Sequence, residues 1–273
     1  MEFIEKYNIL IEEIRKIGEV LSIGKSGGEN LPVNNESDID IFVFCSQIPN
    51  IEKRKNTIEK SGLDISEITI NETGGRFWGI CDFIIIDDTD ICFMYFTVSD
   101  MSDEIDSVLN GSRLDRENEY FYPTGRCATF LSMHILCDKT GYIADMKKRL
   151  SEYPVSLAQK LYNHHIRKIN DSEDFTRAVS RGDVLFYHAV LEKSIDHFLQ
   201  ALFALNQCFF PSRKRNMQFI EKFKHKPAEC SERILKVIEL GAGTKTLSQS
   251  YDIWCVLCTE LSEFKNMYML NDN

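Results

Sequence analysis

The chain has 273 residues, of which 43% are hydrophobic and 27% charged, a balance typical of a globular protein with room for two domains. Its net charge of −10 disfavours duplex DNA or tRNA as a ligand, because phosphate contacts favour a basic surface. A cationic or neutral small molecule fits this charge better. The sequence contains neither an apolar run of membrane-spanning length nor the layout of a signal peptide, so we expect a cytoplasmic protein with no membrane partner.

Helical and strand-like patterns alternate over the first hundred residues. Apolar spacing predicts a helix over 3–17, and the segment PNIEKRKNTIEKSG predicts a surface helix that ends at Gly62. The segments RFWGICDFIIID and DICFMYFTV flank DDTD, which predicts a hairpin. Further strands are predicted at 19–24, 40–45 and 64–70. We therefore expect an α+β domain with a mixed sheet over residues 1–112.

Strand signals largely stop after about residue 101, and long helical patterns follow. Turn residues separate these patterns, so we expect a helical bundle over residues 113–273. The predicted helices lie at 126–137, 142–151, 156–169, 174–207, 216–225, 229–240 and 247–269.

Nine cysteines are scattered along the chain, many of them in apolar runs, which indicates reduced thiols and no disulfide framework. Cys255 and Cys258 form a C-x-x-C in a helical pattern without a second pair to complete a zinc site, so we expect them to pack in the core. His164 and His165 are expected on an exposed helix face, and His197 in a core or an interface.

The most informative segment is GKSGGENLPVNNESDIDIFVFC, residues 24–45. Asp38 and Asp40 project to the same face of a strand, about 6–7 Å apart, where their charges repel. A divalent cation between the two carboxylates would offset this repulsion, since Mg²⁺ binds one or two carboxylates together with substrate phosphates. Upstream, Gly27 and Gly28 allow backbone N–H groups to approach an anion, and Ser26 adds a hydroxyl. The pattern therefore predicts a phosphate site beside a metal site.

This segment resembles the hallmark of the nucleotidyltransferase superfamily related to polymerase beta. The hallmark is a Gly-Gly or Gly-Ser pair, a short spacer, and Asp-x-Asp or Asp-x-Glu between apolar residues. Here nine residues separate Gly28 from Asp38. The two-domain layout is similar to that of aminoglycoside and lincosamide nucleotidyltransferases, which pair such a domain with a helical bundle. The layout spans most of the chain, whereas the motif covers only residues 24–44.

The resemblance implies a metal-dependent mechanism. Asp38 and Asp40 would hold two Mg²⁺ ions that orient the α-phosphate of ATP or another nucleoside triphosphate and polarise the attacking hydroxyl. Gly27, Gly28 and Ser26 would hold the β- and γ-phosphates.

The resemblance also implies a third carboxylate on a neighbouring strand, at a position near Cys92. A thiol is a poor Mg²⁺ ligand, because sulfur is soft and the ion is hard. Asp90 has the same strand parity as Cys92 and is the preferred third catalytic and metal-binding acid. Asp82, on the preceding strand, is the alternative. If neither acid reaches the metals, we expect a slow enzyme or a nucleotide-binding relative without turnover.

A second contribution to nucleotide binding is expected from the helical part. The segment that contains RGD and FFPSRKR resembles Arg-Gly-Asp and Pro-x-x-Lys segments of some relatives. Lys214, after a Pro turn, could place a point charge near the triphosphate.

The leading functional hypothesis is an enzyme that moves a nucleoside monophosphate, AMP from ATP, to a hydroxyl of a small molecule such as an antibiotic. An acidic surface would attract a polycationic aminoglycoside, whereas a lincosamide would need a more apolar pocket. The alternatives are a protein-modifying (AMPylating) transferase of the toxin–antitoxin type and a nucleotide sensor that has lost turnover. The sequence identifies neither the acceptor nor the base, and it leaves a monomer or a homodimer open.

Overall fold

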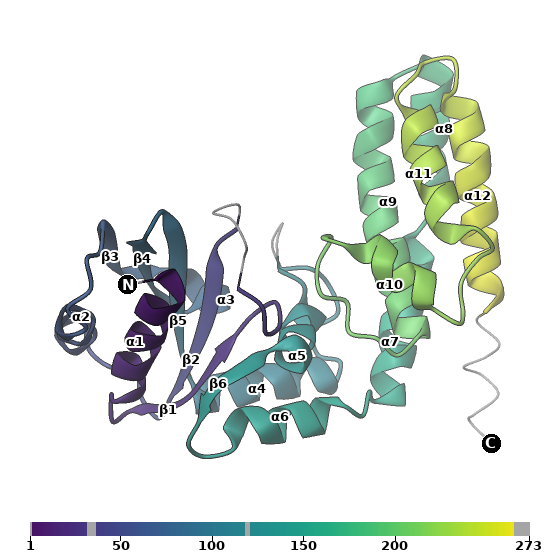
Figure 1. Cartoon of the computed structure of the whole chain (residues 1–273). Helices are drawn as coiled ribbons and strands as arrows, with labels where there is room; N and C mark the ends of the chain where they lie inside the picture. Colours follow the sequence, from purple (N-terminus) through teal and green to yellow (C-terminus); the bar gives the residue numbers. More distant parts are fainter. Residues whose placement is uncertain (1, 32–36, 118–120, 265–273) are drawn as a thin grey trace. The chain divides into compact units, whose positions relative to one another are not determined.

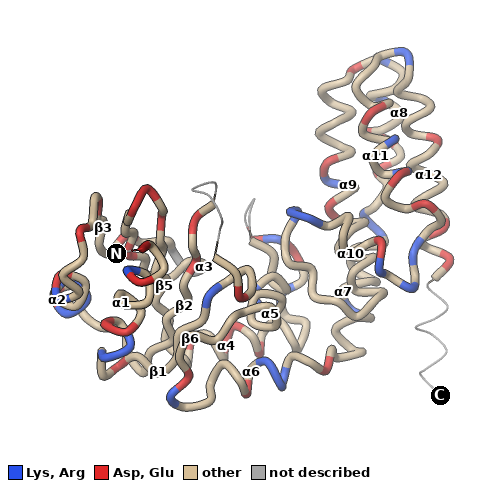
Figure 2. The backbone as a smooth tube through the Cα atoms, in the orientation of Figure 1, with Lys and Arg blue, Asp and Glu red and all other residues tan. Residues whose placement is uncertain are grey.

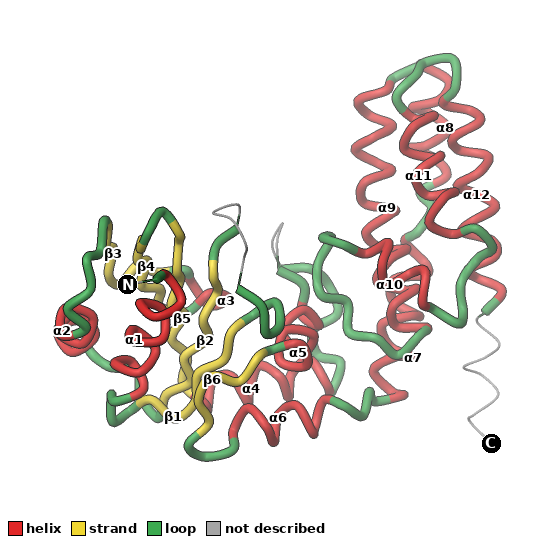
Figure 3. Tube along the Cα trace, viewed as in Figure 1, coloured by secondary structure: helices red, strands yellow, loops and turns green. Residues whose placement is uncertain are grey.

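The computed structural model describes residues 2–31, 37–117 and 121–264. The chain divides into two units, each built from two stretches of sequence. The first unit comprises Met1–Ser107 and Arg126–Glu152, and the second comprises Val108–Gly125 and Tyr153–Asn273. The strands belong to the first unit, whereas the described part of the second consists of helices and loops (Figures 1 and 3).

The first unit is organised around a six-stranded mixed sheet in the order β3-β4-β5-β2-β1-β6. The central pair, β2 and β5, is parallel, and the other neighbouring strands are antiparallel. Parallel pairing places the first residues of β2 and β5 at the same end of the sheet. The strands are β1 (Val20–Lys25), β2 (Ile39–Cys45), β3 (Glu67–Thr73), β4 (Ile80–Ile86), β5 (Thr89–Thr97) and β6 (His134–Asp138).

Helices α1 (Phe3–Arg15) and α2 (Ile51–Lys60) cover one face of this sheet, which we call the core face. The backbone N–H of Glu2 donates to the Glu5 carboxylate at 3.1 Å, which caps the start of α1. The apolar stripe of α1 packs against alternate residues of the strands, because side chains alternate between the two faces of a sheet. The odd-numbered residues of β2 and β5 that pack in this core are Ile39, Ile41, Val43, Cys45, Ile91, Phe93 and Tyr95.

The even-numbered residues of β2 and β5 form the opposite face, which we call the acid face. The part of this face near the C-terminal end of β2 packs under α5 (Pro123–Ser132) and α6 (Tyr142–Leu150). There the ring of Phe44 lies 5.2 Å from those of Phe130 and Tyr142. Helix α4 (Val98–Leu109) follows β5 directly, and the short α3 (Gly75–Trp78) precedes β4. The part of the acid face at the start of β2 carries Asp38 and Asp40.

The second unit is a set of helices that pack in neighbouring pairs, among them α7 with α9 and α11 with α12. Asp183 caps α9, since its side chain accepts from the Phe186 N–H at 3.0 Å. Trp254 is fully buried, and its indole N–H donates to the Ile169 carbonyl at 3.0 Å. The helices are α7 (Val155–His165), η1 (Ile166–Lys168), α8 (Ser172–Arg181), α9 (Val184–Leu205), α10 (Asn216–Lys222), α11 (Cys230–Gly241) and α12 (Leu247–Glu263).

The predicted α+β class, with a mixed sheet followed by helices, is confirmed. Two predictions of local structure are wrong. The helix predicted over 126–137 ends at Ser132, and β6 follows it and pairs with β1. The helix predicted over 174–207 is broken by Gly182, which takes a left-handed conformation that ends α8. In contrast to the division predicted at residue 112, residues 126–152 lie with the sheet.

The described cysteines are free; Cys258 is buried as expected, whereas Cys255 is only partly buried. None of the helices within the described residues has the length and apolar character needed to cross a membrane.

Candidate active site

The glycine turn lies directly after β1. Gly27 and Gly28 have φ angles of 78° and 86°, in the left-handed region that favours glycine. Within the described residues, a Cβ added at either position would meet no heavy atom within 4 Å, so they leave the backbone there uncovered. The turn therefore needs glycine for its conformation, and its backbone is accessible to a ligand.

A backbone hydrogen bond joins this turn to the acid-bearing strand. The N–H of Ser26 donates to the carbonyl oxygen of Asp40 at 3.0 Å. Lys25, which the sequence analysis did not select, supports the same loop: its buried ammonium donates to the Asn30 carbonyl at 2.9 Å. Burial lowers the pKa of Lys25. The only sequence signal for this residue is a cation immediately before the Ser-Gly-Gly stretch.

Asp38 and Asp40 lie at the start of β2. Ile39, between them, is 2% exposed and packs in the core, so the two flanking side chains project to the acid face. Asp38 is exposed and Asp40 is half-buried. The structure therefore places two carboxylates on one face of a strand, beside the glycine turn.

Cys92 is the β5 neighbour of Asp40 in the parallel register. Its thiol is buried and interacts with that of Cys81 on β4. The interaction with Cys81, burial, and the charges of Asp40 and Asp38 raise the pKa of Cys92. The neighbour of the acid pair is therefore a protonated thiol, which does not provide the hard oxygen ligand that Mg²⁺ prefers.

Asp82, the alternative third ligand, is on the wrong face of the sheet. Its β5 neighbour is Phe93, which packs in the core, so Asp82 faces α2 and not the acid face. There it accepts hydrogen bonds from the Arg54 Nε at 2.8 Å and from the Asn71 N–H at 2.9 Å. Both ionic side chains are almost completely buried. The structure therefore contradicts a role for Asp82 as a metal ligand and assigns it to a buried ion pair.

Asp90 lies on the acid face, as its parity with Cys92 predicts, and is exposed. It borders a pocket of about 240 Å³ whose lining includes Glu67 and Glu72 of β3. Figure 2 shows acidic positions at this end of the sheet, along the loop between β4 and β5 and at the start of β2. A metal-binding role for Asp90 stays a prediction.

Lys214 belongs to the second unit and is exposed. Its backbone N–H donates to the Ser212 hydroxyl at 3.1 Å. The adjacent Arg213 forms an ion pair with Asp196, with Nε 2.9 Å from the carboxylate. Nucleotide binding by Lys214 also stays a prediction.

The donors on the acid face fit Mg²⁺ only in part. Asp38 and Asp40 supply the one or two carboxylates that such an ion takes when phosphates and water complete its coordination. Cys92 does not fit as a third ligand.

Comparisons with known proteins identify no activity for this chain. A family model described as a domain of unknown function (DUF4037) matches residues 122–215, roughly a third of the chain. No curated protein matches. Among solved structures, the chain is similar to the crystal structure of a nucleotidyltransferase-like protein from Exiguobacterium sibiricum 255-15. The sequences are 13% identical, the match covers 97% of this chain and 77% of that one, and the TM-score is 0.46.

Proposed function

We propose that this chain is a Mg²⁺-dependent nucleotidyltransferase that moves a nucleoside monophosphate, AMP from ATP, to a hydroxyl group of a small molecule. The observation that supports this most directly is the 3.0 Å hydrogen bond from the Ser26 N–H to the Asp40 carbonyl. It holds an open glycine turn and an acid pair side by side on one face of the sheet. Phosphates and a divalent cation need such adjacent groups.

In the proposed reaction, the backbone N–H groups of Gly27 and Gly28 bind the β- and γ-phosphates. Asp38 and Asp40 would hold Mg²⁺, which would offset the phosphate charge. A bond forms between the acceptor oxygen and the α-phosphorus while the bond to the bridging oxygen breaks. Pyrophosphate leaves with that electron pair, and the hydroxyl proton passes to water.

The acceptor is proposed from charge. The net charge of −10 favours a polycationic small molecule such as an aminoglycoside over a lincosamide, which would need a more apolar pocket. Transfer to a protein would use the same chemistry, and the same assay would reveal it: label from radioactive ATP would then appear on a polypeptide.

A second candidate is a nucleotide-binding sensor without turnover, and the position of Cys92 favours it. A protonated thiol beside Asp40 leaves the acid pair without a third carboxylate at this register position. In this case Cys92→Asp would introduce pyrophosphate release, whereas the parent protein would bind ATP and release none.

The decisive experiment measures ATP binding by calorimetry and pyrophosphate release, each with and without Mg²⁺, in the presence of candidate acceptors. Asp38→Asn and Asp40→Asn are expected to abolish both the magnesium-linked binding and the release. The matched control is Asp88→Asn, which removes the same charge from an exposed turn residue outside the acid pair. Unchanged magnesium-linked binding in both Asp38→Asn and Asp40→Asn would contradict the proposal. Binding without release would support the sensor.

A further inference from the structure

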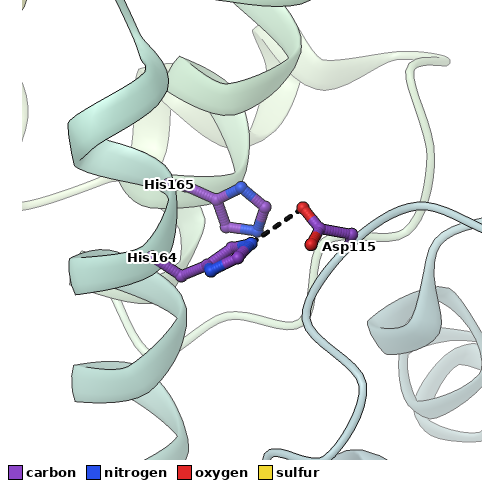
Figure 4. A group of neighbouring side chains, drawn as sticks. All are labelled: Asp115, His164 and His165. Atoms are coloured by element: carbon purple, nitrogen blue, oxygen red, sulfur yellow. Dashed lines mark hydrogen bonds and ion pairs between the residues drawn. The ribbon is translucent and has the colours of Figure 1, made fainter.

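A second group of potential metal ligands lies entirely within the second unit. Asp115 belongs to the segment between α4 and α5, whereas His164 and His165 end α7. Their ligand atoms all lie within 4.8 Å of one another. Figure 4 shows both imidazole rings directed toward the Asp115 carboxylate. The sequence analysis expected both histidines on an exposed face, but His165 is completely buried.

The contacts of His164 cannot all be satisfied at once. Its Nε2 lies 2.8 Å from Asp115 Oδ1 and 2.9 Å from the Lys168 ammonium, which is itself 3.0 Å from Asp115 Oδ1. If Nε2 carries a proton, it donates to Asp115 and faces the ammonium hydrogens. If it does not, it accepts from Lys168 and its lone pair faces the carboxylate. A metal cation at the position of the ammonium would accept electron pairs from both groups.

His165 makes two contacts, and which of them it satisfies depends on its tautomer. Its Nε2 lies 3.0 Å from the Leu114 carbonyl, and its Nδ1 lies 2.9 Å from Nδ1 of His197. One proton between the two Nδ1 atoms is required for this hydrogen bond, and either ring can supply it. With the proton on Nε2, His165 donates to the Leu114 carbonyl; with the proton on Nδ1, this hydrogen bond is lost and the Nε2 lone pair is available to a metal. His197 then orients the ligand from behind, as the outer partners of metal-bound histidines do.

We propose that Asp115, His164 and His165 form a binding site for one Zn²⁺ ion, positioned by His197 and independent of the acid face. Two imidazoles and one carboxylate are a ligand set that zinc accepts, with water in the fourth position. Zinc–ligand bonds of about 2.0–2.2 Å place tetrahedral donors roughly 3.3 Å apart, so His164 and Asp115 need to separate only slightly.

The site would tie the segment after α4 to the end of α7, and its role would be structural.

Cobalt spectroscopy on the full-length protein tests this site, because Co²⁺ replaces Zn²⁺ and its spectrum reports the ligand type. We expect one equivalent of Co²⁺ with nitrogen and oxygen ligands and no thiolate charge-transfer band, displaced by Zn²⁺. His164→Gln and Asp115→Asn are expected to weaken binding by at least about tenfold. Lys168→Met is expected to strengthen it, because it removes a competing cation, a gain that a purely structural lysine would not give.

Two controls isolate the site. His188→Gln removes another partly exposed imidazole of the same unit, and Asp40→Asn disables the acid face. Neither is expected to change Co²⁺ affinity. The proposal is overturned if a thiolate charge-transfer band accompanies binding, or if the His164, Asp115 and Lys168 variants bind Co²⁺ as the parent does.

Discussion

The substitution Asp82→Asn tests whether this acid is structural or catalytic. In the folded protein, Arg54 is 1% and Asp82 0% exposed at the side chain, and Arg54 also donates from Nη1 to the Pro49 carbonyl at 2.6 Å. Asparagine keeps the shape but removes the charge, so a buried guanidinium is left without its counterion. Breaking a buried ion pair in this way costs about 3–5 kcal/mol. Since a folded domain is stable by only about 5–15 kcal/mol, we expect the thermal midpoint to fall by roughly 10 °C.

The measurement combines thermal and urea unfolding, followed by circular dichroism, with calorimetry of ATP and Mg²⁺ below the transition. We expect Asp82→Asn to unfold earlier and to bind the nucleotide as before. The matched double variant Arg54→Met/Asp82→Leu should recover much of the lost stability, because an apolar pair can replace a buried ionic one at little cost. This reasoning would be refuted if Asp82→Asn had the same thermal midpoint as the parent protein but had lost the magnesium-linked binding of ATP.

Three further predictions follow from the same structure. Gly27→Ala should weaken ATP binding in calorimetry with only about 1 kcal/mol of destabilisation, because its φ of 78° disfavours alanine while the space around it is open. Gly24→Ala should destabilise the fold by roughly 1–3 kcal/mol in urea titrations, since its Cβ would overlap Met133; Gly18→Ala, where no atom is near, is the control and should be nearly neutral. Burial holds the pKa of His165 in the folded protein at about 3, below the value of about 6.5 in an unfolded chain. The contribution of His165 to the free energy of unfolding is therefore fully present above about pH 6.5 and is lost as the pH falls toward 3. We expect a loss of about 2 kcal/mol by pH 5, and His165→Gln should flatten this dependence; equal slopes in the two proteins would contradict it.

The sequence predicted best those elements whose apolar residues follow either the spacing of a helix or the spacing of a strand, but not both. The strand 40–45 and the helix 3–17 are examples, and both occur with small shifts of their ends. The segment that contains β6 was misread, because HILCD continues the apolar pattern of α5 and only pairing with β1 makes it a strand. The cluster around His165 was missed for a related reason: its partners, Asp115 and His197, lie 50 and 32 positions away along the chain.

Register decides which acids can share a site, and local spacing does not. Asp82 and Asp90 are both candidates in the sequence, because each lies in a strand of the predicted hairpin. In the structure Asp82 pairs with Phe93 and Asp90 pairs with Ile85, so the first faces the core and the second the acid face. A shift of one residue in this hairpin would exchange their faces. The parallel register of β2 with β5 then sets Cys92, not an aspartate, beside Asp40. For the proposed function, the choice between transfer of a nucleotide and binding alone therefore depends on one side chain, the thiol of Cys92.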